Sequence, residues 1–450
     1  MASAAEQMAS NLSWGSFGKA KELQQRIMFA LGLLIVYRIG TFIPVPGIDT
    51  EQLRAFFEQN QAGVGGMLNM FTGGAISRMA IFSLGIMPYI SASIIVQLMT
   101  AMVPQLEALK KDGEQGRKKI NQYTRYGTVF LAMFQSYAIA VGLESQGMAS
   151  DPGLFFRATV MITLVGGTMF LMWLGEQITA RGIGNGISLI IFTGIVAGLP
   201  VALAQFFTSG RSGAISPVMI IAVMVMVVAV IALVVFIERS LRKVHIQYPK
   251  RQVGMKVYGG ESSHLPIKLN PAGVIPAIFA STLLLMPTTI AAFATNDSTG
   301  IASIIAAYFG RGQPLYMIFF AAMIIFFAYF YTANVAFKTE DVADNLKKQG
   351  GFVPGIRPGA KTAEYLDYVS QRLLVVGGAY LAAVCLLPEF LISRTAIPFY
   401  FGGTSVLIVV SVTMDTITQV QSHMLAHQYE SLIEKSKLRG KNRAKARGRR

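Results

Sequence analysis

The chain has 450 residues, of which 53% are hydrophobic and 14% are charged, and its formal net charge is +16. An ordinary soluble domain cannot hide so large an apolar fraction in its core, so this composition excludes that class and indicates a membrane protein. The single cysteine, Cys385, excludes a disulfide framework and a thiol metal cluster.

Ten apolar segments follow one another along the chain, each near or above the roughly 20 residues that a helix needs to cross the hydrocarbon. They are 27–44, 77–104, 126–143, 155–174, 183–207, 217–237, 271–293, 314–337, 373–392 and 398–421. About 32 of the 39 Lys and Arg residues fall in the two termini and the even-numbered connections, which predicts that both termini face the cytoplasm. We therefore expect an all-α membrane protein with ten transmembrane helices.

The spans divide into two halves of five. Because five is odd, the two halves enter the membrane in opposite directions, as an inverted repeat requires. The predicted parts are a cytoplasmic N-terminus (1–26), a first half (27–207), an outer connection (208–216), a second half (217–421) and a basic cytoplasmic tail (422–450).

A nine-residue pattern, Gly-x-x-Pro-x-Ile-x-Ala-Ser, occurs in the second span of each half, starting at Gly85 and at Gly273. A shorter pattern, Gly-x-Ser-x-x-Ile, occurs in the fifth span of each half, starting at Gly186 and at Gly403. Matches between the halves of an inverted repeat point to a working site between them.

Isoleucine is the residue that these patterns place between the halves. A single isoleucine in a membrane helix usually packs against other residues or faces lipid. The register of the repeats distinguishes five isoleucines from the rest. Together they predict an apolar constriction that blocks ions by dewetting and yields around a larger passenger. The five are Ile86, Ile90, Ile191, Ile278 and Ile408.

Between the first two spans lie residues 61–75, an apolar and glycine-rich segment too short to cross the membrane. It fits two interpretations: an outer loop on the surface, or a mobile re-entrant helix that enters the pore. Sequence physics alone leaves both open.

Two long cytoplasmic connections, 239–270 and 338–372, carry basic residues. The first alternates basic and apolar residues with turn signals, which predicts an exposed hairpin. The second contains a polar helix near 340–349, after which Arg357 stands directly before Pro358 and is held extended. Positive-inside charge explains most of these cations, but the length of the loops indicates docking of a large acidic partner such as a ribosome or a motor protein.

Ionisable residues are scarce inside the spans, and only Asp415 lies well within one. A packing or interfacial role for it is as plausible as a functional one. His423 and His427 are four residues apart and could share a metal, but a solvated helix face fits them better. The tail after Lys435 is nearly continuous positive charge, for which we expect disorder. It fits two roles equally well: contact with ribosomal RNA or anionic phospholipid, or positive charge that serves only membrane topology and solubility.

Five stretches, LGIMPYISAS, RGIGNGIS, FVPGIRPG, GVIPAIFAS and YFGGTS, resemble those of the SecY family, the central subunits of bacterial protein-conducting channels. The likeness covers nearly the whole chain, in the right order. It implies an hourglass pore between two halves hinged at 208–216, with a front seam between spans two and three on one side and seven and eight on the other.

The resemblance also implies roles for single residues, which are expectations here. The five isoleucines become a pore ring. The plug comprises Val64, Met67, Leu68, Asn69, Met70 and Phe71; the seam, or lateral gate, includes Ser91, Ile94 and Met286; and the partner-docking cations are Arg357, Lys250, Arg251 and Lys256. Where relatives often carry two adjacent basic residues, this chain has Met255 and Lys256, which weakens the docking role of that tip.

The implied function is passage of unfolded secretory polypeptides across the bacterial inner membrane, with sideways release of signal sequences and membrane helices. The implied partners are SecE, SecG, the SecA ATPase, the ribosome, signal peptides and nascent chains, with YidC and SecDF as further candidates. No phosphate loop, metal motif or nucleophile elbow is present in the sequence, so we expect no enzyme activity and no cofactor. A secondary transporter for a small solute and a non-conducting scaffold remain as alternatives.

Overall fold

The structure is a computed structural model, and it describes residues 21–59, 69, 71–212, 216–249, 251–253, 256–258, 262–293, 313–394 and 403–447. The helices of the first half are α3 (Lys21–Gly40), α4 (Thr50–Gln59), the 3₁₀ turn η1 (Ile76–Arg78), α6 (Met87–Met102), α7 (Pro104–Lys111), α8 (Glu114–Ser145), α9 (Leu154–Arg181) and α10 (Gly186–Arg211).

The second half begins with α11 (Pro217–Arg239) and four strands, β1 (Leu241–Gln247), β2 (Arg251–Val253), β3 (Lys256–Tyr258) and β4 (Ser262–Lys268). It continues with α12 (Ile275–Phe293), α14 (Pro314–Tyr331), the π-helical turn η2 (Thr332–Ala336), α15 (Thr339–Lys348), α16 (Ala360–Arg394) and α17 (Gly403–Arg447).

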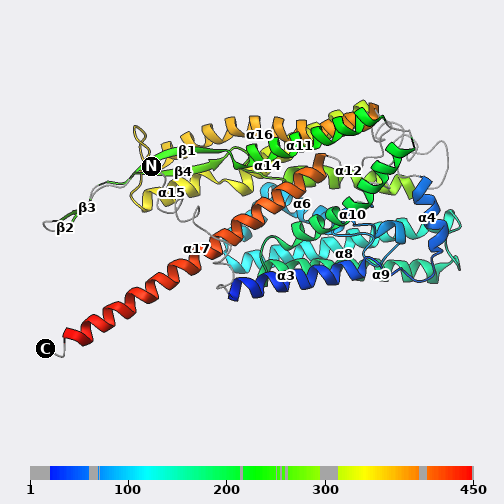
Figure 1. The fold of residues 1–450 in the computed structure, drawn as a ribbon, viewed down its shortest axis with the longest axis horizontal. Coiled ribbons are helices and arrows are strands. Elements are labelled where there is room, and N and C mark those ends of the chain that lie inside the picture. Colours follow the sequence, from blue (N-terminus) through cyan, green and yellow to red (C-terminus); the bar gives the residue numbers. More distant parts are fainter. Residues whose placement is uncertain are drawn as a thin grey trace.

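Most of the long helices run lengthwise along the bundle, whereas α17 crosses it diagonally (Figure 1). Helices α3, α8 and α9 of the first half lie on one side of the bundle, and α11, α14 and α16 of the second half lie on the other. Helices α6, α10 and α12 lie between them, and their buried isoleucines belong to one large apolar core.

Each of the ten predicted spans overlaps a helix. Among the described residues, seven helices are long and apolar enough to cross a membrane, or eight if α6 and α7 are counted as one span bent by 99°. Helices α3 and α12 occupy the other two predicted positions. The chain is therefore a multi-pass membrane protein.

The second predicted span starts later than the sequence suggested. Residues 77–86 form the end of η1 and a series of turns, and helix α6 begins only at Met87. Gly85 adopts a left-handed backbone conformation, φ +57°, which a helix cannot continue through and which glycine tolerates best.

The nine-residue pattern has the same backbone shape in both halves. Gly273 is left-handed like Gly85, with φ +62°, and each glycine precedes a helix whose second residue is proline, Pro88 or Pro276. Proline fits there because the first turn of a helix does not need its missing N–H. The pattern therefore encodes a sharp turn into a helix that carries an isoleucine of the core.

The shorter pattern encodes a close helix contact. A Cβ atom on Gly186 would collide with the carbonyl oxygen of Gly175 in α9, and one on Gly403 would collide with the carbonyl oxygen of Val384 in α16. The fifth helix of each half therefore begins against the backbone of the fourth.

The two long connections fold together at one end of the bundle, which we call the hairpin end (Figure 1). Strand β1 pairs antiparallel with β4, and β2 with β3, which confirms the predicted hairpin. Helix α15 confirms the predicted polar helix. A bridge of two backbone hydrogen bonds, 2.9 and 3.0 Å, joins Gln247 to Phe352, so hairpin and second connection form one unit.

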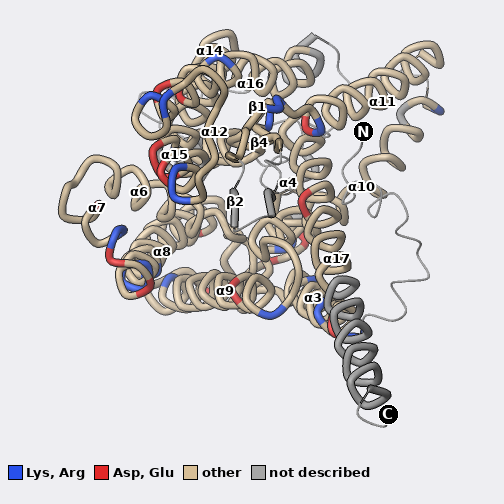
Figure 2. The backbone as a smooth tube through the Cα atoms, turned by 90° about the vertical axis from the view of Figure 1, so that its left-hand side faces the viewer, with Lys and Arg blue, Asp and Glu red and all other residues tan. Residues whose placement is uncertain are grey.

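Lysine and arginine residues of α7, α8 and α15 gather at the hairpin end (Figure 2). Helix α17 extends from the bundle toward this end and continues to Arg447, so the expectation of a disordered tail was wrong for the backbone up to that residue. Alanine, lysine and arginine favour helix, and no proline follows Pro398 to interrupt it.

Candidate functional site

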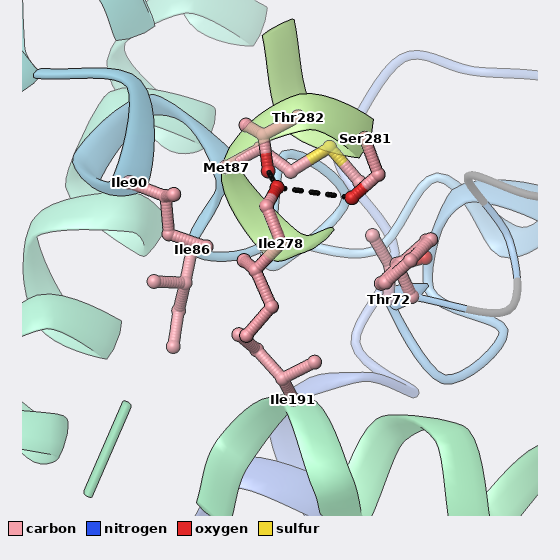
Figure 3. Close-up of a pocket in the computed structure, with 10 residues that line it drawn as sticks. Thr72, Ile86, Met87, Ile90, Ile191, Ile278, Ser281 and Thr282 are labelled. Carbon is pink, nitrogen blue, oxygen red and sulfur yellow. Dashed lines mark hydrogen bonds between the residues drawn. The ribbon is translucent and has the colours of Figure 1, made fainter. Parts of the chain in front are cut away.

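Four of the five predicted ring isoleucines surround a small cavity between the halves. Ile86, Ile90, Ile191 and Ile278 line it, and each is at most 7% exposed. Its volume is about 20 Å³, which is room for about one water molecule. Figure 3 shows Ile191 of α10 and Ile278 of α12 pointing toward each other, with Ile86 and Ile90 beside them.

The polar side chains around this cavity are turned to their own backbone. The hydroxyls of Ser281 and Thr282 both donate to the carbonyl oxygen of Ile278, at 2.9 and 2.7 Å (Figure 3). A hydroxyl bonded back into its helix is less able to hold water in the cavity. The constriction therefore behaves as an apolar surface, which disfavours a continuous file of water.

Ile408 is placed differently. It is fully buried in α17 and belongs to the same apolar core, but it does not line the cavity. The structure therefore brings four of the five isoleucines together and leaves Ile408 in the packing behind them.

Two of the predicted plug residues lie in the described part of the chain. Phe71 lines the cavity beside the isoleucines, and the side chain of Asn69 accepts a hydrogen bond from the backbone N–H of Ser77 at 3.1 Å. The others, Val64, Met67, Leu68 and Met70, lie outside the described residues.

The predicted seam is closed. Helix α12 packs against both α6 and α8, and Ser91 and Ile94 of α6 are each 1% exposed. The Ser91 hydroxyl has no hydrogen-bond partner among the described residues, an arrangement that costs about 1–3 kcal/mol. Met286 lies in α12, and its side chain is outside the description.

Three of the four predicted docking cations lie in the described part of the chain, at the hairpin end. Arg357 is exposed and lies between two turns, outside any helix or strand, and Thr362 donates a hydrogen bond to its carbonyl oxygen at 2.9 Å. Arg251 and Lys256 lie in β2 and β3, on the outer part of the hairpin, with side chains outside the description. Lys250 is not among the described residues.

Asp415 pairs with the hairpin. Its carboxylate lies 3.7 Å from the Lys268 ammonium of β4, and the two side chains are 64% and 55% exposed. An exposed pair of this kind contributes little, so Asp415→Asn should lower the free energy of unfolding by less than about 1 kcal/mol. Thermal unfolding in detergent measures this.

The variant Glu144→Gln, in α8, provides a comparison for Asp415→Asn. Glu144 is 9% exposed, pairs with Arg157 at 2.6 Å and also accepts the backbone N–H of Gly153 at 2.6 Å. Because Glu144 is buried and its charge is bonded both to the half-buried Arg157 and to a backbone N–H, Glu144→Gln should lower the unfolding temperature clearly more than Asp415→Asn. Equal effects would contradict this ranking.

Three residues next to the cavity were missed by sequence reasoning. Tyr37 and Arg38, at the end of α3, and Gly194, in α10, all contact the chain segment at 71–73. In the sequence, Arg38 is a cation near the end of the first predicted span, and nothing in its local sequence indicates a contact with residues 35 positions away.

The comparisons with known proteins decide the family. A family model described as SecY matches residues 80–417. The chain belongs to the SecY family. The protein translocase subunit SecY of Pseudomonas aeruginosa is 55% identical over 430 residues, covering 95% of this chain and 97% of that protein. The SecY subunit of Escherichia coli K12 is 54% identical over 431 residues, with the same coverage.

Solved structures share the SecY fold. A structure titled as a protein-conducting channel aligns with a TM-score of 0.64 at 20% identity, covering 88% of this chain and 92% of that one. Sec61 in a canine ribosome-channel complex aligns with a TM-score of 0.59 at 20% identity, with the same coverage. This likeness supports the all-α channel fold.

Proposed function

We propose that this SecY chain is the pore-forming subunit of a protein translocase. It passes unfolded secretory polypeptides across the cytoplasmic membrane and releases signal sequences and membrane helices sideways into lipid. An unfolded chain cannot cross lipid directly, because each unsatisfied backbone polar group costs several kcal/mol there. The protein must therefore offer a path that can fill with water and close again.

The observation that carries the proposal is the closed isoleucine constriction. Four isoleucines from α6, α10 and α12 and the turn before α6 meet around a cavity of about 20 Å³ between the halves. They act as the pore ring, with Ile408 behind them, and the segment that includes Phe71 acts as the plug. Aliphatic side chains make no fixed polar contacts, so they can separate around a passenger and close afterwards.

The seam between α6, α8 and α12 is the exit into lipid. A Leu-like residue gains about 0.3 to 0.6 kcal/mol at mid-membrane, so an apolar signal core of about ten residues gains several kcal/mol by leaving sideways. Ser91, Ile94 and Met286 line this lateral gate. The unpartnered buried hydroxyl of Ser91 lowers the stability of the closed seam.

The hairpin end faces the cytoplasm, as do both termini, in the bacterial inner membrane. Its surplus of lysine and arginine supports this orientation. Arg357, with Lys250, Arg251 and Lys256, binds the SecA ATPase or the ribosome. SecE and SecG are the small membrane subunits, and YidC, SecDF and anionic phospholipid are further partners. The chain itself is a conduit and not an enzyme.

Photocrosslinking tests the proposal. A photoreactive residue at Ile278 should crosslink to a stalled secretory chain in membrane vesicles supplied with the cytosolic motor and ATP, at positions that shift with the length of the stalled chain. The same residue at Ile221, which is 65% exposed on α11, is the matched control and should give no such crosslink. If Ile278 gives none while the protein is intact, the channel proposal fails and solute uptake becomes the next assay.

A further inference from the structure

The segment that follows the predicted plug is held at three successive carbonyl groups. The Tyr37 hydroxyl donates to the carbonyl oxygen of Thr72 at 3.3 Å, and Arg38 Nη1 donates to that of Gly73 at 2.6 Å. Arg78 Nε donates to the carbonyl oxygen of Gly74 at 3.0 Å. Two of these three donors come from the end of α3, which is distant in sequence.

The other side of this segment rests on α10. A Cβ atom on Gly194 would lie 2.8 Å from the carbonyl oxygen of Phe71 and 3.1 Å from the Tyr37 hydroxyl. Gly73 has φ +65°, and a Cβ there would lie 3.0 Å from the Cα of Gly194. The two backbones therefore meet at a glycine on each side, with Tyr37 at the junction.

This junction lies directly beside the constriction. Gly194 is three residues after Ile191 and so lies on the same side of α10. Phe71 and Thr72 line the cavity together with Ile191 and Ile278. A shift of residues 71–73 away from α10 would therefore open the wall of the cavity.

The contact of Arg38 combines a charge with a planar ring. Its guanidinium lies 4.9 Å from the centre of the Phe42 ring, and the guanidinium of Arg78 lies 4.1 Å from the same ring. Stacking on the ring orients a guanidinium, and a hydrogen bond from a charged donor is stronger than one from a neutral donor. Lysine has the charge but lacks the planar fork that this geometry uses.

We propose that Tyr37, Arg38 and Gly194 form a clamp that holds residues 71–73 against the isoleucine ring while the pore is at rest. Tyr37 and Arg38 are positioning residues, because they act through the backbone of Thr72 and Gly73. The clamp rests on the proposed function, since it assumes that the ring is the seal of a pore. Release of two hydrogen bonds frees the segment when a polypeptide enters.

The test is ion conductance of the full translocase in planar bilayers, measured at rest and again with an engaged secretory chain. Tyr37→Phe and Arg38→Lys should each raise the resting conductance about 3- to 10-fold, the population change expected for the loss of one hydrogen bond. The conductance with an engaged chain should stay at the wild-type level, because the clamp is then already released.

Two variants serve as matched controls: Tyr123→Phe, at an exposed tyrosine of α8, and Arg211→Lys, in the last turn of α10. Neither should change the resting conductance. A general loss of structure would alter both conductances, so the separation of the two readouts distinguishes the clamp from simple destabilisation.

The outcomes separate the two proposals. If the wild type translocates and crosslinks at Ile278 but both clamp variants have the resting conductance of the wild type, the clamp is overturned and the proposed function stands. If the wild type neither translocates nor crosslinks, both are overturned. Raised conductance in the clamp variants alone, with unchanged engaged conductance, supports the clamp.

Discussion

Replacing the four cavity isoleucines together by serine is expected to raise the resting ion conductance by about tenfold or more. Each buried isoleucine contributes about 1.5–3 kcal/mol to keeping the constriction dry, and each 1.4 kcal/mol removed from a barrier is a factor of about ten in rate. Serine also supplies a hydroxyl that can hold water. Planar-bilayer recording without a secretory chain measures this. The four residues are Ile86, Ile90, Ile191 and Ile278.

The control replaces four isoleucines of the helix surfaces by serine, and it should leave the resting conductance unchanged. All four are at least 61% exposed: Ile35, Ile162, Ile221 and Ile318. If the quadruple cavity variant has the same resting conductance as the wild type, the four isoleucines do not form the ion seal. Ile408→Ser alone should have a smaller effect on conductance than Ile278→Ser, because Ile408 does not line the cavity.

Gly186→Ala and Gly403→Ala are expected to destabilise the two halves by the same mechanism. In each case the new methyl group would strike a backbone carbonyl of the preceding helix, that of Gly175 or of Val384, and backbone cannot rotate away. Forcing extra atoms into such a contact costs roughly 1–3 kcal/mol. The measurement is thermal unfolding of the purified protein in detergent.

Helix-interior glycines with open space provide the matched controls. At Gly166 of α9 and Gly198 of α10, an added methyl group would have no atom within 4 Å beyond its chain neighbours and the backbone of its own helical turns. Alanine there should keep or raise the unfolding temperature, because it favours helix by up to about 1 kcal/mol over glycine. Destabilisation at these positions equal to that at Gly186 would show that the close contacts are not the cause.

The hairpin and the polar helix could be read from the sequence because their signals are local. Alternating basic and apolar residues with turns predicted β1 and β4, and the polar run before Gly350 predicted α15. Each element's own residues decide its type. That the two elements join through Gln247 and Phe352 was not readable, since pairing between distant segments leaves no mark in either one.

The position of Asp415 shows the same limit. Its place within an apolar segment left a packing or interfacial role and a functional role equally open, and the structure pairs it with Lys268 at the foot of the hairpin. Which charge a helix residue meets depends on how far a separate element reaches along that helix, and this is a matter of tertiary packing.

The sequence by itself determined the membrane class, the apolar spans, the duplicated glycine turns and the candidate isoleucines, because hydrophobic length and glycine or proline chemistry act within one segment. Only the tertiary structure decided that four of the five isoleucines enclose the cavity and that Tyr37 and Arg38 hold residues 72 and 73 beside it. These contacts join segments that the chain brings together only when its helices pack, so their geometry exists only in the folded protein.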